Sequence, residues 1–400
     1  MSLTNGLRAL LALACLLLVG ELTFAACRYD DWLGTNDFIE YWSAGQLLLR
    51  RANPYDFTAL HELQKAVGRV ESMPIIMWNP PWLLVLFYPL LMFPFRVAET
   101  LWFGLSLAVL LSSTLLIWRL FVPLTSPTRL LVPLLATVIF APALFTLRMG
   151  QVSVLVLLGI AGFLHFERKG RDLWAGAFLV LLTFKPHVTY LLWIAVAWWV
   201  VSRGRWRVVW GLGGALLVLC GLLTPLRPMW ALDYLSALRH PPLYWRTPVL
   251  GTVLRLFFGW NRAWLQYLPS LLLSLLLLFT LHRRRRPFVW SEAASPLLLL
   301  SVPTAAYGWS FDQLALLVPY LQAVAWLRQY HTGHPIRSLI IAMGLIASSA
   351  MTLWCNASLR DDIYLLWAPL VWGVLYLVAQ WALGGRWVGA ALTACGEEKG

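Results

Sequence analysis

The chain has 400 residues, of which 60% are hydrophobic and only 12% are charged. This composition excludes an ordinary soluble domain and predicts an all-α, polytopic integral membrane protein. The net charge of +13 does not indicate a nucleic-acid partner, because most Lys and Arg residues lie in short links between apolar runs.

The N-terminal segment is largely apolar from residue 7 to residue 26 and is long enough to cross a bilayer. Its core resembles that of a signal peptide, and the residues from Phe24 to Cys27 faintly resemble a lipoprotein cleavage site. Because about eleven further apolar segments follow, we interpret this segment as an uncleaved first transmembrane helix.

Residues 27–80 form the longest polar stretch, with seven acidic against five basic residues, which is typical of a non-cytoplasmic loop. Residues 35–49 have helical spacing and predict a short amphipathic helix at the membrane surface. Asp37 and Tyr41 share one face of that helix, with Glu40 beside them. A turn at 53–56 is expected to end it, and residues 60–70 predict a second amphipathic helix.

Apolar runs fill most of the remaining chain. The first, 80–95, is short and broken by prolines, so it either crosses the membrane or dips in and returns. Eleven more lie near 97–118, 129–146, 150–166, 172–184, 187–201, 206–224, 264–282, 293–306, 311–328, 337–355 and 362–382. Together with the first helix they predict about 12 transmembrane helices in a single domain, 1–384, followed by a cytoplasmic tail, 385–400.

Basic clusters orient these runs. The links at 168–171, 203–207, 283–286 and 328–337 are predicted to be cytoplasmic, which places both chain ends there. This arrangement requires that 80–95 does not fully cross and that 172–201 crosses twice. If 80–95 crosses and 172–201 is one kinked helix, the total is again about 12, but Gln151 moves to the inner side.

Seven residues that interrupt or flank the apolar pattern are the candidates for a site: Asp37, Tyr41, Gln151, Lys185, His187, Trp309 and Asp312. The preferred topology puts them on one outer side. Each also has a structural interpretation. Asp37 would suit a helix N-cap, Lys185 would suit a snorkelling lysine, Gln151 lies in a plausible interhelix turn, and Trp309 suits an interfacial belt.

The sequence has no phosphate-binding glycine loop, no Ser-His-Asp signature and no Cys/His cluster with metal-ligand spacing. A membrane enzyme that works outside the cytoplasm without ATP needs a preactivated donor, and lipid-phosphate sugars are donors of this kind. Aromatic residues beside an acid, as in 307–312, also suit a sugar ring.

At these residues the chain resembles glycosyltransferase family eighty-seven, the polyprenyl-phosphate-mannose-type membrane glycosyltransferases of the GT-C fold class. The matching pieces appear in the family's order over about residues 35–315: Asp37-Phe38 with Tyr41-Trp42 and Ala44; the turn 53–56; Pro80, Pro81, Pro89 and Pro94; Gly150-Gln151-Val152; Ala175-Gly176 leading to Lys185-Pro186; and 307–312. Two pieces depart from the family pattern, Ser153 where Asn is usual and 247–252 in the large later outer loop.

The resemblance implies a reaction and a set of roles. A hexose, mannose by the family resemblance, would move with inversion from a polyprenyl-phosphate donor to a lipid or glycan acceptor, without a metal or other cofactor. Asp37 would be the general base, and Lys185 with His187 would neutralise the donor phosphate. Gln151, Trp309 and Asp312 would hold sugar or acceptor, with Tyr41 in the same substrate-binding set. The protein would lie in the inner (plasma) membrane, with its active site on the outer, periplasmic side.

Two other functions are compatible with the residues alone. The intramembrane lysine and the broken helices also suit a transporter or flippase of lipid-linked sugars. A non-catalytic membrane scaffold, whose outer loop only binds a partner, is the third possibility.

Overall fold

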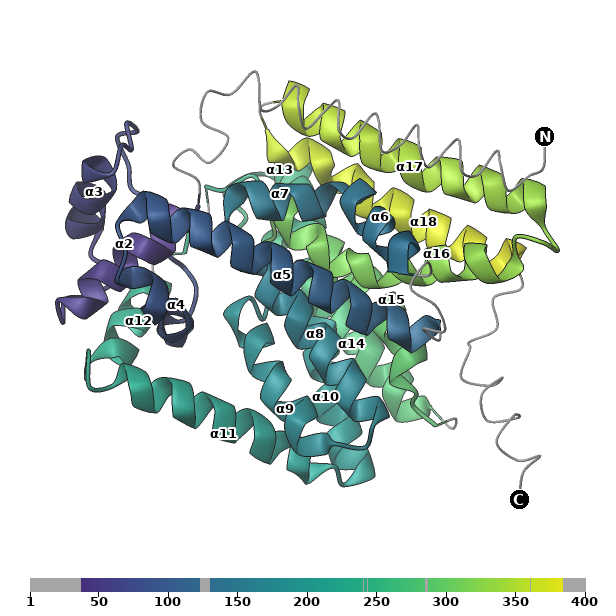
Figure 1. Ribbon diagram of the computed structural model, residues 1–400, viewed down its shortest axis with the longest axis horizontal. Coiled ribbons are helices and arrows are strands. Elements are labelled where there is room, and N and C mark those ends of the chain that lie inside the picture. Colours follow the sequence, from purple (N-terminus) through teal and green to yellow (C-terminus); the bar gives the residue numbers. More distant parts are fainter. Residues whose placement is uncertain are drawn as a thin grey trace.

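The computed structural model describes residues 37–122, 130–239, 241–242, 244–284, 287–359 and 361–383. Within these ranges every regular element is a helix, as the composition predicts (Figure 1). The expected first transmembrane helix at 7–26, the loop residues before Asp37 and the tail at 385–400 lie outside the described residues.

The described part of the polar stretch contains two helices, α2 (Phe38–Leu49) and α3 (Phe57–Ala66). The expected turn at 53–56 is confirmed, because the backbone N–H of Asp56 donates to the carbonyl oxygen of Asn53 at 3.2 Å. The side chain of Asp56 then caps α3 by accepting a hydrogen bond from the backbone N–H of Ala59 at 2.9 Å. The predicted surface location of α2 is wrong, since ten of its 12 residues are buried. Protein rather than lipid covers this helix: α3 packs on it, as does α4 (Leu84–Leu91).

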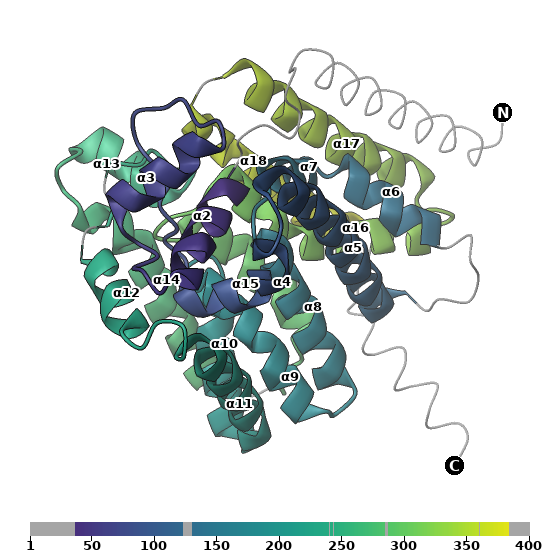
Figure 2. The same cartoon turned by 60° about the vertical axis from the view of Figure 1, so that its left-hand side comes forward.

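The proline-broken run 80–95 forms a short 3-10 turn, η1 (Pro81–Leu83), and then α4. Eleven helical residues rise about 16 Å, whereas the hydrocarbon core of a bilayer is about 30 Å thick. This run is therefore too short to cross as one helix. In Figure 1, α2, α3, α4 and α12 (Trp230–Leu238) gather at the left-hand end, and Figure 2 turns that end toward the viewer.

Five continuous helical segments in the described ranges are long and apolar enough to cross a membrane: α5 (Phe95–Phe121), α11 (Trp206–Leu223), α14 (Trp264–Arg283), α17 (Pro335–Ser358) and η5 (Asp362–Leu366) with α18 (Trp367–Ala382). A sixth span is possible if α6 (Leu131–Ile139) and α7 (Ala141–Met149), which meet at a bend of 70°, count as one. These helices support a multi-pass membrane protein but not the count of 12.

The other apolar runs form helical segments that are too short or not apolar enough to meet that criterion. The described elements of this kind are α8 (Ser153–Arg168), α9 (Asp172–Leu179) with η3 (Val180–Phe184), α10 (Tyr190–Arg203), α15 (Trp290–Thr304) and η4 (Ser310–Leu316) with α16 (Leu317–Tyr330). Most of α8 and α16 is buried inside the protein. Apolar runs of this kind fill a protein core as readily as they span lipid, so counting them overestimates the number of long spans.

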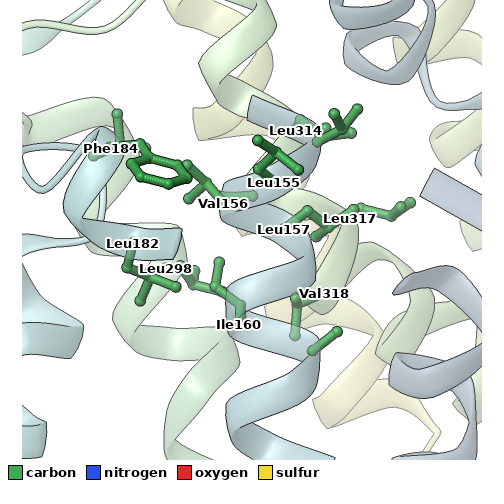
Figure 3. Close-up of a cluster of buried hydrophobic side chains, with 14 of the residues drawn as sticks. Leu155, Val156, Leu157, Ile160, Leu182, Phe184, Leu298, Leu314, Leu317 and Val318 are labelled. Atoms are coloured by element: carbon green, nitrogen blue, oxygen red, sulfur yellow. The ribbon is translucent and has the colours of Figure 1, made fainter. Parts of the chain in front are cut away.

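The core lies around α8. Its side chains Val156 and Ile160 meet residues of η3, α15 and α16, among them Leu182, Leu298 and Val318 (Figure 3). All are nearly or completely inaccessible to solvent. This packing fixes the first residues of α8, which lie at the candidate site, against the ends of η3 and η4.

Close approach of α9 and α11 depends on two glycines. A Cβ atom at Gly176 would overlap the carbonyl oxygen of Val208, and one at Gly211 would overlap the carbonyl oxygen of Leu173. Backbone atoms cannot give way as a flexible side chain can, so only glycine fits at either crossing position. Small residues that allow backbones to touch are a common packing device between membrane helices.

We expect Gly211→Leu to force α9 and α11 apart and to destabilise the protein by at least the roughly 1–3 kcal/mol typical of an overpacked core. Thermal unfolding in detergent would show the loss as a lower midpoint. Gly214→Leu on the same helix is the matched control, because a Cβ there meets nothing within 4 Å. Equal midpoints for the two variants would contradict this packing argument.

Candidate active site

A cavity of about 820 Å³ opens where seven segments of the chain meet. They are the start of α2, the start of α3, the loop 73–80, the α7–α8 junction at 149–151, the η3–α10 junction at 184–187, α12 with residues 241–242 and 244–245, and the segment 307–311 that leads into η4. Four of the sequence-predicted site residues line it: Asp37, Gln151, Lys185 and His187. Trp309 also lines it, so the cavity brings together five of the seven.

Asp37 precedes α2 but does not cap it with its side chain. Its Oδ2 atom instead accepts a hydrogen bond from Nε2 of Gln151 at 2.8 Å, across 114 residues of sequence. Burial raises the pKa of this carboxyl above its ordinary value, while the Gln151 hydrogen bond and the Lys185 charge act in the opposite direction. Asp37 therefore faces the cavity and not its own helix.

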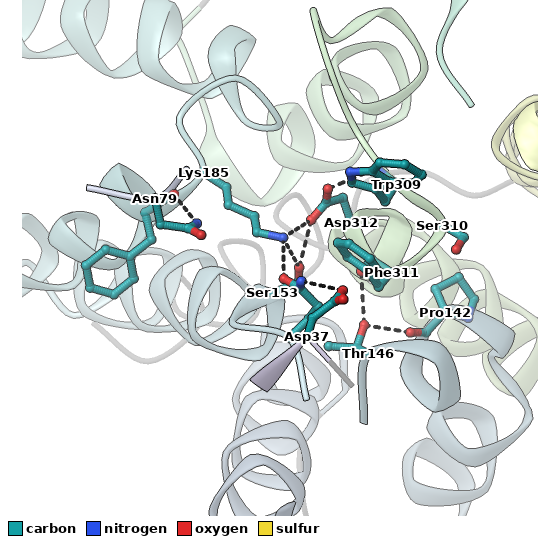
Figure 4. A network of polar contacts seen from close by, with 12 residues as sticks. Asp37, Asn79, Pro142, Thr146, Ser153, Lys185, Trp309, Ser310, Phe311 and Asp312 are labelled. Carbon is teal, nitrogen blue, oxygen red and sulfur yellow. Dashed lines mark hydrogen bonds and ion pairs between the residues drawn. The ribbon is translucent and has the colours of Figure 1, made fainter. Parts of the chain in front are cut away.

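Lys185 lies in the break between η3 and α10 and is 6% exposed. Its ammonium group donates to Oδ1 of Asp312 at 2.6 Å, Oε1 of Gln151 at 2.8 Å and Oγ of Ser153 at 3.2 Å (Figure 4). The ring of Phe311 lies 4.5 Å from Nζ. These three acceptors match the three N–H groups of an ammonium, so Lys185 is fully bonded and does not snorkel.

Asp312 lies behind Lys185. It is 4% exposed and is not among the residues that line the cavity. Its Oδ2 accepts from the backbone N–H of Trp309 at 3.0 Å, and its Oδ1 accepts from Ser153 at 2.8 Å. Burial opposes ionisation, but the bond and charge of Lys185 hold the pKa of Asp312 below its ordinary value. In this structure Asp312 supports the lysine and does not itself face the cavity.

Tyr41 also lies behind the cavity surface. Its hydroxyl donates to Oε1 of Gln151 at 2.9 Å, and its ring stacks on Phe87 with centroids 5.2 Å apart. Tyr41 is completely buried and, like Asp312, does not line the cavity. It therefore positions Gln151.

The family model of Glycosyltransferase family 87 matches residues 78–294, more than half of the chain. The chain belongs to glycosyltransferase family 87. It is accordingly a membrane glycosyltransferase, an enzyme that takes a sugar from a donor to an acceptor. No curated protein and no solved structure gives a match.

The matched range of this family 87 protein holds Gln151, Lys185 and His187 but neither Asp37 nor Asp312. The fold brings those two acids, one from before the matched range and one from after it, to the residues inside it. Ser153 stands where Asn is usual in the family pattern, and its Oγ accepts the third hydrogen bond of Lys185. The residue that differs from the pattern is therefore part of the site.

Several residues that line the cavity are not among the predicted site residues, although the sequence predicts Glu40 beside Asp37 on the first amphipathic helix. Glu40 is 7% exposed, and burial together with the neighbouring Asp37 charge raises its pKa well above the ordinary value. Its position three residues after Asp37, on the same helical side, was a usable signal. Asn79 donates to the carbonyl oxygen of Phe184 at 2.9 Å and so ties the first loop to the Lys185 break.

An aromatic wall, Trp78, Trp245, Tyr307 and Trp309, forms another part of the lining that the sequence did not reveal as a unit. Trp245 is its centre, with ring centroids 6.1 Å from Trp78, 6.4 Å from Tyr307 and 5.5 Å from Trp309. These rings come from three segments distant in the sequence. No local pattern could have grouped them.

The Lys185–Asp312 pair gives a stability prediction. Lys185→Met should leave an uncompensated buried carboxylate and destabilise the protein by about 3–5 kcal/mol, and adding Asp312→Asn should restore a large part of the loss. Denaturant or thermal unfolding in detergent measures both. Glu71→Gln is the control, because the Arg69–Glu71 pair has a 57% exposed acid and should contribute at most about 1 kcal/mol. Independent, additive losses from the two site substitutions would contradict the pairing.

His187 gives a pH prediction. Burial lowers its pKa to about 4, from 6.5 for an ordinary histidine. Between these values the unfolded chain binds more protons, so the contribution of His187 to stability falls as the pH is lowered from 6.5 to 4. The pKa of Glu40 is raised in the folded protein, so the contribution of Glu40 to stability increases as the pH is lowered through part of this range.

The comparison of wild type with His187→Asn isolates the histidine, because both proteins keep the same carboxyl groups. The difference in unfolding midpoint, wild type minus variant, should decrease from pH 7 to pH 4. A difference that stays constant over this range would show that His187 does not titrate as its burial implies.

Proposed function

We propose that this protein transfers a hexose, with mannose as the first choice, from a polyprenyl-phosphate donor to a hydroxyl group of a lipid or glycan acceptor. The observation that carries the proposal is the hydrogen-bonded chain Asp37–Gln151–Lys185, which holds a carboxylate and an ammonium group at one cavity. A carboxylate can accept the acceptor's proton, and a nearby positive charge favours departure of a phosphate.

In the proposed reaction Asp37 takes the proton from the acceptor hydroxyl. The acceptor oxygen forms a bond to the anomeric carbon of the donor sugar as the bond from that carbon to the phosphate oxygen breaks. The lipid phosphate leaves with the electron pair, and attack from the opposite face inverts the anomeric configuration. The raised pKa of Asp37 suits this role, because a base close in pKa to the working pH is the most effective.

Lys185 would supply the positive charge for the phosphate. Its three hydrogen bonds are already made, so direct contact with phosphate requires the exchange of one acceptor, and the Ser153 bond is the longest at 3.2 Å. His187 also lines the cavity and is neutral near pH 7, so it would offer a hydrogen bond rather than a full charge.

The walls of the cavity suit the two parts of a lipid-linked sugar. Met73, Pro74, Ile75 and Ile76 form a largely aliphatic side, which would accommodate isoprenoid units. The aromatic wall offers ring faces on which the apolar face of a sugar stacks. Asp37, Glu40 and Asn79 would accept or donate hydrogen bonds to its hydroxyl groups.

An outer, periplasmic location in the plasma membrane is also part of the proposal. Two helices run away from the cavity toward basic links: α8 from Ser153 to Arg168, and α10 from Tyr190 to Arg203. The 16 residues of α8 span about 24 Å, most of the thickness of a bilayer core. Basic links favour the cytoplasmic side, so the cavity would lie at the opposite side.

The test is transfer of radiolabelled mannose from synthetic polyprenyl-phosphate-mannose to a lipid and glycan extract by purified protein. Asp37→Asn should reduce the rate by about 10²–10⁴-fold, because the variant cannot take up the proton. Glu62→Gln, on the exposed side of α3, is the control and should transfer at the wild-type rate.

Full activity of Asp37→Asn would exclude Asp37 as the base. Failure of the wild type with mannose and with other lipid-phosphate hexoses would exclude the proposed donor class.

A further inference from the structure

Gln151 is the centre of the polar network, and its amide can lie in only one orientation. Its Oε1 atom accepts from Lys185 at 2.8 Å and from the Tyr41 hydroxyl at 2.9 Å. An ammonium has no acceptor, so the atom facing Lys185 must be the oxygen. The amide nitrogen consequently faces Asp37, at 2.8 Å.

The backbone around Gln151 is held firmly. Gly150 ends α7 in the left-handed region, at φ 63°, which reverses the chain before α8. The carbonyl oxygen of Gly150 accepts from the indole of Trp102 at 2.7 Å, and the backbone N–H of Gln151 donates to Thr146 at 3.1 Å. Gln151 is 5% exposed, and its hydrogen bonds to Lys185, Tyr41 and Asp37 already occupy the amide oxygen and nitrogen.

We propose that Gln151 is a positioning residue that transmits the charge of Lys185 to Asp37, aiming the Asp37 carboxylate and keeping it ionised, rather than a sugar-binding residue. Hydrogen bonds in a chain polarise one another, so an amide whose oxygen faces an ammonium is a stronger donor at its nitrogen. A stronger donor favours the ionised carboxylate. This inference rests on the proposed function only in treating Asp37 as the base.

Other charged or titratable groups also act on Asp37 and must be counted. Asp312 raises its pKa, and Arg69 lowers it, as Lys185 does. Glu40 and Tyr41 lie next to it on α2, and His187 faces the same cavity. The test therefore changes only Gln151 and leaves all these groups in place.

The test follows the protonation of Asp37 without substrate. Purified protein in nanodiscs is treated with a hydrophobic carbodiimide, which modifies protonated carboxyl groups, and labelling of Asp37 is measured by mass spectrometry from pH 4 to pH 9. In Gln151→Met, which keeps the length but loses all three hydrogen bonds, the midpoint should rise by about one pH unit, a tenfold change in proton affinity. In Gln151→Glu, which keeps the oxygen that faces Lys185 and Tyr41, the midpoint should rise at least as far.

Gln322→Met is the matched control. Gln322 is 3% exposed, and its Oε1 accepts from a buried tyrosine, Tyr376, at 3.0 Å, but it does not line the cavity. Its substitution should leave the Asp37 midpoint unchanged. An unchanged midpoint in both Gln151 variants would overturn the proposal, and so would an equal shift in Gln322→Met, which would indicate general loosening.

The labelling needs no sugar transfer, so the two proposals fail separately. A wild type that transfers no hexose rejects the proposed donor but leaves the labelling result valid. If the enzyme is active but the labelling midpoint of Asp37 is the same in wild type and in the Gln151 variants, only the proposed role of Gln151 is rejected.

Discussion

The buried ion pair between Lys185 and Asp312 is the interaction on which the site depends. An ammonium group in an apolar interior is costly unless a carboxylate neutralises it and acceptors satisfy its hydrogens. Asp312 provides the charge, and Ser153 and Gln151 provide the other acceptors. These groups come from η4, the η3–α10 break and the start of α8. The hydrogen bonds among them therefore fix these three segments relative to one another.

The apolar core makes that pair effective. Leucine, valine and isoleucine side chains around α8 exclude water from the inner side of the network. In such surroundings hydrogen bonds are stronger and unpaired polar groups are more costly than at a surface. The same exclusion of water holds α2 against α3 and α4, so Asp37, the residue before α2, is held at the cavity.

The site residues come largely from breaks in helices. Gln151 follows a left-handed glycine, Lys185 precedes Pro186, and Trp309 precedes a 3-10 turn. Irregular backbone at membrane depth is tolerated where protein buries it or where it lines a cavity, because its polar groups need partners. A family 87 glycosyltransferase can therefore concentrate polar chemistry at these breaks while its long helices remain apolar.

The sequence by itself determined the helical membrane class, the family and the positions of the breaks between helices. Composition and the placement of Gly and Pro are local properties that can be read directly from the chain. It also identified Asp37, Gln151 and Lys185 as polar residues that interrupt or flank the apolar runs. Only the tertiary structure decided what each side chain does: α2 is buried, Asp312 stands behind Lys185, and Trp245 joins an aromatic wall. Helical periodicity is the same whether lipid or protein covers a face, and contacts across more than a hundred residues leave no local pattern.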